Sequence, residues 1–387
     1  MLDPLKITHM NEASQESAIW CPLHVVIVPS DLNSCKQHQK LSEKAAQKTV
    51  SRQVSGEGTR AGMAYAEIAK RPIDAASIHP SRELEDSTRF IDDWPTLNAI
   101  YEEQGYLLLR SVLHRPSIDH ALRRMMAVMA RHGIVDADAT EPLWTGKPLI
   151  GRHEESAEFG GICQELVSTP ANMSVFEKVL GEPVAAVPIV QYRSYPPNSP
   201  LLMVHQDGFY SPGIKGFRPV WIPLTTIDES VGGLMLALGL HREGPLHRTD
   251  MPPSYPILAG VIPEDAWATT TFYPGDVLVV HPWTPHVGAP NTSNRVRFSI
   301  DTRVQSAHNP CVLLGDVIAV DSTSVTLRTA RGEKRLALDA ETFIRTEERA
   351  GVRVPFAEVV AKVPLGLRVV ASFEGERALM LRRASEA

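Results

Sequence analysis

The sequence has few cysteines, and none of them are spaced for a disulfide or zinc framework. Four cysteines occur among 387 residues, and no two form a Cys-x-x-Cys pair: Cys21, Cys35, Cys163 and Cys311. Scattered cysteines of this kind are typical of reduced thiols in the cytosol. We therefore expect a cytoplasmic protein without structural disulfides.

The chain also lacks a block of basic residues and a long apolar run. Its formal net charge is -6, and without a Lys/Arg cluster that could follow phosphates we expect no nucleic-acid partner. The apolar run at residues 21–29 is too short to cross a bilayer. It is not preceded by a basic segment or followed by a clear small-residue cleavage site, so it is not a signal peptide. We expect no membrane partner.

Residues 1–85 have little of what a folded domain needs. Residues 36–60 are polar, contain no aromatic residue and show no sustained periodicity, as is typical of disordered segments. Met63 resembles an alternative translation start. We interpret residues 1–85 as a disordered or extension segment.

The rest of the chain predicts helices first and strands after them. Its composition, 43% hydrophobic and 22% charged, is that of an ordinary globular protein. We expect helices at residues 94–104, between the N-cap Asp93 and Gly105, and at residues 117–132, which carry an amphipathic stripe. A third helix ends at Leu180, with Asn172 or Ser174 as its cap.

From residue 183 onward the pattern changes to short β-rich runs separated by Pro and Gly. These runs are residues 186–192, 220–224, 234–238, 277–280 and 296–300. Many short strands with turn signals indicate a jelly roll or a related barrel. We predict a mainly β fold with flanking helices: a double-stranded β-helix (jelly-roll or cupin-like) core over residues 86–308.

Five further β-like runs predict a small β-barrel-like accessory domain over residues 309–387. They are residues 312–320, 324–327, 335–338, 367–371 and 378–381. No chemical motif occurs among them. Substrate presentation, contact within a homodimer and simple stabilisation all remain open as the role of this region.

The strongest chemical signal begins at His205-Gln206-Asp207, after the apolar residues 201–204. In an extended strand the side chains of His205 and Asp207 point to the same face. A charge facing a barrel interior is costly unless it is paired or bound to a metal. A neighbouring His and Asp supply two ligands of the 2-His-1-carboxylate triad that holds non-haem Fe(II), although His-x-Asp alone is common by chance.

The second half of the signal lies 79 positions after Asp207, at His286. Arg297 follows eleven residues later, in a run whose alternation places it on the face opposite Phe298. A guanidinium matches a carboxylate with two parallel hydrogen bonds. His281 competes with His286 as a ligand. Arg295 and Arg303 compete with Arg297, and an ion pair with Asp301 is the structural alternative for Arg297.

Together, His205-x-Asp207, His286 and Arg297 resemble the phytanoyl-CoA dioxygenase (PhyH-like) family of Fe(II)/2-oxoglutarate-dependent oxygenases. The similarity covers residues 97–303 and includes the apolar run after Gly105-Tyr106 and a Gly-Leu-His corner at residues 239–241, where the family has Gly-Ser-His. The resemblance implies that His205, Asp207 and His286 are the catalytic metal ligands, with Fe(II) as cofactor. It also implies 2-oxoglutarate and O2 as co-substrates and stimulation by ascorbate.

The resemblance further implies which residues hold the co-substrate. Arg297 is assigned to the distal carboxylate of 2-oxoglutarate. Gln191 and Trp221 are weaker contacts, and for Gln191 an ordinary polar strand position is an equal alternative. Phe209 and Tyr210 line the substrate mouth or pack in the core, while surface or substrate-lining positions are expected for His241 and His247.

The implied reaction is oxidation, above all hydroxylation, of an unactivated C–H bond in a small organic substrate, with release of succinate and CO2. Asp207 argues against halogenation, because related halogenases have a small residue at this position. Two other functions stay open: a non-catalytic cupin-like protein that binds a small molecule or metal, and a metal-dependent cupin isomerase. We expect the substrate to be a specialised metabolite or a small acid.

Overall fold

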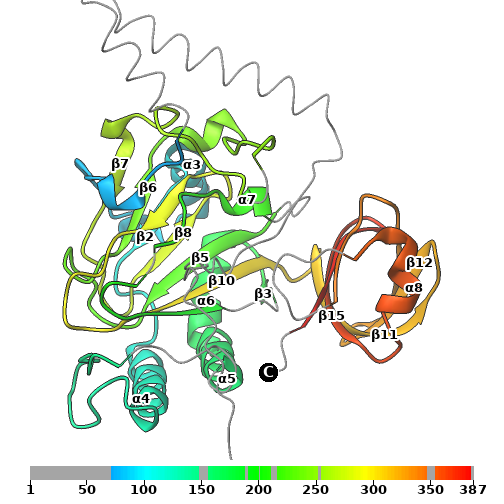
Figure 1. Cartoon of the computed structure of the whole chain (residues 1–387), viewed down its shortest axis with the longest axis horizontal. Coiled ribbons are helices and arrows are strands. Elements are labelled where there is room, and N and C mark those ends of the chain that lie inside the picture. The colour runs from blue at the N-terminus through cyan, green and yellow to red at the C-terminus, as the bar shows by residue number, and fades with distance from the viewer. Residues whose placement is uncertain are drawn as a thin grey trace, which may run out of the picture.

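The β core of the protein consists of two facing sheets covered by helices on one side (Figure 1). The computed structural model describes residues 71–147, 156–187, 191–199, 201–210, 216–251, 254–346 and 354–384. The expectations for residues 1–70 lie outside these ranges. Within them, no helix is both long enough and apolar enough to span a membrane.

The larger sheet carries six strands and the smaller one four. In the larger sheet the order is β2 (Tyr106–Leu109), β8 (Val277–Val280), β5 (Arg218–Pro223), β10 (Arg297–Ser306) and β3 (Val184–Ala186), with β4 (Gln191–Tyr195) also paired to β10. In the smaller sheet the order is β1 (Arg82–Glu83), β7 (Trp267–Thr269), β6 (Leu234–Ala237) and β9 (His286–Gly288). This is the mainly β, double-stranded β-helix core that the sequence predicts.

Two hydrophobic clusters explain why the larger sheet is buried on both faces. One cluster lies between the sheets and includes Tyr106, Trp221 and Phe272. The other joins the sheet to the helices and includes Leu107 and Ile222. The helices are α3 (Trp94–Gln104), α4 (Arg115–Arg131), α5 (Ser156–Val167) and α6 (Pro170–Leu180). All six positions of β5 are buried as a result.

The helix boundaries test the sequence prediction closely. Helix α3 begins after Asp93, whose carboxylate accepts a hydrogen bond from the Thr96 amide, and ends at Gly105 with φ +79°, as predicted. Helix α6 instead begins after Thr169, so the predicted cap at Asn172 or Ser174 is wrong. Asn172 is buried within the helix, and its side chain bonds backbone atoms of His114 and Leu166. The sequence analysis missed α5.

Part of the segment interpreted as disordered belongs to the core. Residues 71–85 include the 3-10 helix at Ala75–Ser77 and strand β1, which pairs in parallel with β7. The Ile73 amide also donates to the Ile257 carbonyl at 3.1 Å. The prediction of disorder is therefore wrong for residues 71–85. Strand β1 consists of two residues that pair with a distant strand, and so short a strand leaves no recognisable pattern in the sequence.

The last six strands form a third sheet that closes on itself. Its order is β13 (Gly332–Ala337), β12 (Ser324–Thr329), β11 (Val312–Val320), β15 (Arg368–Glu374), β16 (Arg377–Arg383) and β14 (Phe343–Arg345). Pairing of β13 with β16 closes the sheet, which surrounds its own hydrophobic cluster. We call β11 to β16 the C-terminal barrel.

The remaining short helices are η2 (Thr88–Phe90), η3 (Leu240–Glu243), η4 (Glu264–Ala266), η5 (Phe356–Glu358), α7 (Asp207–Tyr210) and α8 (Val359–Lys362).

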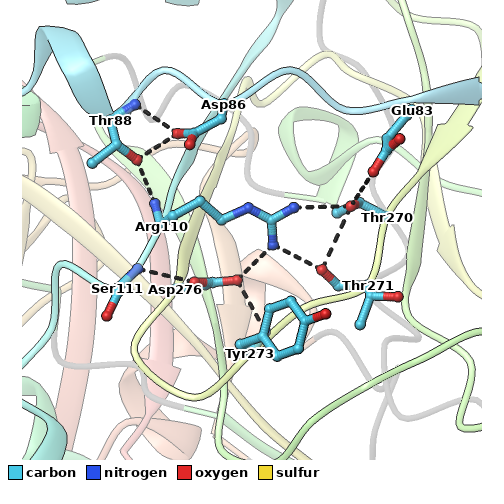
Figure 2. A network of polar contacts seen from close by, with 9 residues as sticks. All are labelled: Glu83, Asp86, Thr88, Arg110, Ser111, Thr270, Thr271, Tyr273 and Asp276. Atoms are coloured by element: carbon cyan, nitrogen blue, oxygen red, sulfur yellow. Dashed lines mark hydrogen bonds and ion pairs between the residues drawn. The ribbon is translucent and has the colours of Figure 1, made fainter.

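A buried ion pair fixes the turn that leads into β8 (Figure 2). Asp276 is 2% exposed and accepts hydrogen bonds from the Arg110 guanidinium at 2.7 Å and from the amides of Ser111 and Tyr273 at 3.0 and 2.9 Å. One carboxylate thus ties the end of β2 to the start of β8. Strand β8 precedes the segment that carries His286.

We predict that Asp276→Ala lowers the free energy of unfolding by about 2–4 kcal/mol, because it leaves two amides without their acceptor and removes the carboxylate that pairs with Arg110. Chemical denaturation monitored by circular dichroism measures the change. Glu83→Ala is the matched control, since exposed Glu83 bonds only the Thr270 hydroxyl in this network, and it should change stability by less than about 0.5 kcal/mol. Equal effects of the two variants would refute the role of Asp276.

Candidate metal and co-substrate site

The backbone brings His205 and His286 side by side. The two residues exchange amide-to-carbonyl hydrogen bonds of 3.0 and 2.9 Å, and their ring centroids lie 4.3 Å apart. His286 opens β9, while His205 forms only this isolated bridge. Residues far apart in the sequence therefore meet at the edge of the smaller sheet.

Asp207 reaches the same place by a route that the sequence analysis did not predict. Residues 201–204 do not form a strand, and Asp207 is the first residue of the short helix α7. The predicted strand with His205 and Asp207 on one face is therefore wrong. Asp is disfavoured in strands and favoured in the first turn of a helix, and the turn at Gln206 carries the carboxylate to the histidines.

His205, Asp207 and His286 can each offer one ligand atom, and these atoms all lie within 4.8 Å of one another. Nε2 of His205 is 3.7 Å from Oδ1 of Asp207. The two imidazoles are buried and the carboxylate is nearly so. Two imidazoles and one carboxylate are the donor set of a facial triad.

Each of the two histidine rings turns its Nδ1 toward a backbone carbonyl. Nδ1 of His205 lies 2.9 Å from the Met203 carbonyl, and Nδ1 of His286 lies 3.0 Å from the Thr284 carbonyl. A carbonyl only accepts, so each Nδ1 carries the proton and each Nε2 presents a lone pair. Outer hydrogen bonds of this kind fix metal-binding histidines, and the cluster fits a divalent metal ion.

The electrostatics of the cluster also favour ligation. Burial, together with the neighbouring His286, lowers the pKa of His205 to about 3, so its ring is neutral at pH 7. Burial alone would raise the pKa of the Asp207 carboxyl, but Arg303 and the two histidines hold that pKa below its usual value. The His205 imidazole therefore stays neutral and the Asp207 carboxylate stays ionised at neutral pH.

Gln206 holds the two ligands that flank it, and the sequence analysis missed it. Its side chain is fully buried and donates to the carbonyls of Gly244 and Trp283 at 2.9 and 2.7 Å. It also accepts from the Leu246 amide at 2.8 Å. Gln206 thus joins the His205–Asp207 turn to the loop before His286. In the sequence, the only sign of this role is a glutamine between two candidate metal ligands, and that sign is weak.

We predict that Gln206→Ala weakens metal binding about tenfold, since loss of a residue that orients ligands costs on the order of 10–100-fold in affinity. Titration with Co(II), followed by its visible absorption, measures the dissociation constant. Gln104→Ala serves as control, because Gln104 bonds Glu85 far from the cluster. A variant at 206 that loses thermal stability but binds Co(II) normally would contradict the positioning role.

A cavity lies beside the triad and includes Arg297 in its wall. Arg297 is 5% exposed, its guanidinium stacks on Tyr195 at 4.5 Å, and it donates to the Gly232 carbonyl. Gly288 leaves room for it, because a Cβ there would lie 3.0 Å from Nη2. The face assignment of β10 is confirmed: Phe298 packs in the helix-facing cluster and Arg297 lines the cavity.

The structure distinguishes Arg297 from the other arginines considered for binding the co-substrate. Asp301 pairs with Arg193 at 2.5 Å, so the alternative ion pair with Arg297 does not form. Arg295 pairs with Asp228 at 2.6 Å and is not part of the cavity wall. Arg303 does line the cavity and lies 3.5 Å from Asp207.

The two weaker co-substrate candidates lie on strands of the larger sheet. Trp221 lines the cavity from β5 and packs edge-on against Phe272. Gln191 begins β4 and pairs with Asp301, and its side chain lies outside the described part of the structure. The role of each residue stays a prediction.

The other histidines do not join the cluster. His281 packs against Tyr101 and His241, with ring centroids 5.4 and 5.1 Å away. His241 and His247 are 6% and 7% exposed, so a surface position is wrong for both, while the alternative of a substrate-lining position stays a prediction. His247 accepts a hydrogen bond from the Gln206 amide and stacks on Phe209 at 4.0 Å, behind the ligand turn.

Comparisons with known proteins agree with the motif. The profile of the family described as Phytanoyl-CoA dioxygenase (PhyH) matches residues 101–299. A 1-deoxypentalenic acid 11-beta-hydroxylase from Streptomyces exfoliatus is 32% identical over 239 residues, which cover 57% of this chain and 84% of the relative. The corresponding hydroxylase from Streptomyces arenae is 31% identical with the same coverage.

Solved structures show only distant similarity. The apo form of the non-heme monooxygenase ThoJ is 22% identical, with a TM-score of 0.42, over 58% of this chain and 82% of that protein. The epimerase SnoN, solved with Fe3+, alpha ketoglutarate and nogalamycin RO, is 16% identical, with a TM-score of 0.41, over 55% and 84%. Scores this low carry no weight for function.

Proposed function

This chain belongs to the phytanoyl-CoA dioxygenase family, and we propose that it is an Fe(II)- and 2-oxoglutarate-dependent dioxygenase that hydroxylates a small organic substrate. One observation carries the proposal: ligand atoms of two imidazoles, each with its Nδ1 turned to a backbone carbonyl, and of one carboxylate converge within 4.8 Å beside a buried arginine. A protein that only bound a small molecule would not need both the triad and the arginine.

Different residues would bind the metal, bind the co-substrate and enclose the cavity. His205, Asp207 and His286 would hold Fe(II), which with 2-oxoglutarate and O2 supplies the oxidising power for C–H hydroxylation, releasing succinate and CO2. Arg297 would bind the distal carboxylate of 2-oxoglutarate by a pair of charge-assisted hydrogen bonds. Trp221 would limit the cavity on the other side and, with its apolar neighbours, keep water out.

The aspartate favours hydroxylation among the oxidations open to this family. Asp207 occupies a ligand position, with Oδ1 3.7 Å from Nε2 of His205. A carboxylate there leaves no place for a halide in the ligand set. The similarity to hydroxylases of 1-deoxypentalenic acid supports a specialised metabolite as the substrate class.

Turnover of 2-oxoglutarate tests the proposal without knowledge of the substrate. We expect the purified full chain to form succinate slowly when Fe(II), ascorbate and 2-oxoglutarate are supplied in air. Succinate formation should stop without Fe(II) or O2. A protein that binds Fe(II) but forms no succinate, alone or with a library of metabolites, would instead be the non-catalytic binding protein.

A further inference from the structure

The two oxygens of the Asp207 carboxylate face different neighbours. Oδ1 lies 3.7 Å from Nε2 of His205, the ring nitrogen that is turned away from the backbone carbonyl. Oδ2 lies 3.5 Å from Nη2 of Arg303. One oxygen of the carboxylate is therefore close to another candidate metal ligand, while the other oxygen is paired with a guanidinium.

Arg303 reaches the carboxylate from the same strand that carries Arg297. Both residues lie on β10, an even number of positions apart, so their side chains point to the same face of the strand. Both line the cavity. Strand β10 pairs with β5 on one side and with β3 and β4 on the other. The guanidinium of Arg303 is therefore positioned by the interior of the larger sheet and not by a loop.

The surroundings of Arg303 leave Asp207 as its counter-ion. The Arg303 side chain is 11% exposed, and its Nη1 is buried without a hydrogen-bond partner among the described residues. Asp301, the other carboxylate in the cavity wall, pairs with Arg193 at 2.5 Å. The contact of 3.5 Å with Asp207 is longer than the roughly 2.7–2.9 Å of a charge-assisted hydrogen bond. Opposite charges at this distance nevertheless attract strongly away from bulk water.

The number of oxygens that Asp207 gives to a metal decides how many coordination positions stay open. A carboxylate can bind a divalent cation through one oxygen or through both. A facial triad is useful because it leaves open positions for co-substrates, and a second oxygen of Asp207 would fill one of them. Bringing Oδ2 to the metal would break its ion pair with Arg303, which would leave a buried guanidinium without its counter-ion.

We propose that Arg303 is a positioning residue that makes Asp207 a one-oxygen ligand, with Oδ1 on the metal and Oδ2 on the guanidinium. A coordination position thereby stays open for a co-substrate. This inference rests on the proposed function for the identity of the metal and the co-substrates. It also explains why two arginines of β10 line the cavity although the distal carboxylate of 2-oxoglutarate needs only Arg297.

Nitric oxide tests the open position without turnover. The full chain is loaded with Fe(II) in the absence of air, saturated with 2-oxoglutarate and titrated with nitric oxide, which binds Fe(II) where O2 would. The electron paramagnetic resonance signal of the complex measures the affinity. We expect Arg303→Gln to bind nitric oxide about tenfold more weakly than the parent, the lower end of the effect of losing a side chain that orients a metal ligand.

Two further variants separate positioning from a general loss of structure. Arg303→Lys keeps the positive charge and should bind nitric oxide more tightly than Arg303→Gln. Arg295→Gln is the matched control, because Arg295 is also largely buried and pairs with Asp228 at 2.6 Å, outside the cavity wall. Its affinity for nitric oxide should equal that of the parent, and thermal melting checks that all three variants fold.

A crystal structure of the parent chain with Co(II) in the site checks the geometry without any variant. We expect Oδ1 of Asp207 on the metal and Oδ2 on Arg303. Asp207 bound through both oxygens in the parent would overturn the proposal. So would a nitric oxide affinity that is equal in Arg303→Gln and the parent, or equally weakened by the variants at 303 and 295.

The outcomes also distinguish this inference from the function on which it rests. Succinate formed from 2-oxoglutarate by a parent chain whose Asp207 binds Co(II) through both oxygens would leave the proposed function intact and refute the role of Arg303. A one-oxygen ligand without succinate formation would support the role of Arg303 and count against the function.

Discussion

Replacing His286 by Ala should remove tight metal binding and abolish 2-oxoglutarate turnover, whereas replacing His281 by Ala should leave both nearly unchanged. Among the described residues, His286 but not His281 offers a ligand atom within 4.8 Å of ligand atoms of His205 and Asp207. Loss of a group that merely orients a ligand costs on the order of 10–100-fold in metal affinity. Loss of the ligand itself should therefore cost at least about 100-fold.

The pair of variants is informative because the sequence alone left both histidines open as ligands. His281 lies only five residues before His286, but it packs against Tyr101 and His241. Co(II) absorption measures affinity, and succinate formation measures turnover. The assignment fails if His281→Ala loses the metal while remaining folded, or if His286→Ala retains it.

The sequence predicted best where a repeating pattern has one physical cause. The alternation in β10 placed Arg297 opposite Phe298 because one face of the strand packs on helices and the other lines the cavity. The ends of α3 were predictable because an Asp cap and a Gly in the left-handed region each satisfy backbone groups locally. Such signals need no knowledge of distant parts of the chain.

The local structure that brings Asp207 to the site could not be predicted from the alternation of side chains in a strand. The expected strand would have placed His205 and Asp207 on one face, whereas a turn and the helix α7 bring them together. His205 and Asp207 lie close together under either geometry, since only one residue separates them in the sequence. The spacing therefore predicted correctly that these two side chains lie close together, although the predicted local structure was wrong.

Contacts between distant segments were beyond the sequence analysis. Gln206 joins two loops that lie about 40 and 77 residues away, and nothing in its own sequence context marks it. A single sequence records which residues are present but not which long-range pairs form.

Replacing Arg297 by Ala should raise the 2-oxoglutarate concentration needed for half-maximal turnover by at least about 30-fold, because truncating one partner of a buried, hydrogen-bonded charge pair costs about 2 kcal/mol or more. Burial, together with the neighbouring Arg193, lowers the pKa of Arg297, but an arginine stays charged at neutral pH. The free-energy cost of burying the Arg297 guanidinium is offset when a dicarboxylate binds to it. Steady-state succinate formation at varied 2-oxoglutarate measures the effect.

Arg295→Ala is the matched control, since Arg295 lies two residues away and pairs with Asp228 outside the cavity. It should leave the 2-oxoglutarate requirement within about twofold of the parent, a change of less than 0.5 kcal/mol. Co(II) affinity should be normal in both variants, which separates co-substrate binding from damage to the metal ligands. If Arg303→Ala raises the requirement and Arg297→Ala does not, the two cavity arginines have exchanged roles, and Arg303 rather than Arg297 binds the co-substrate.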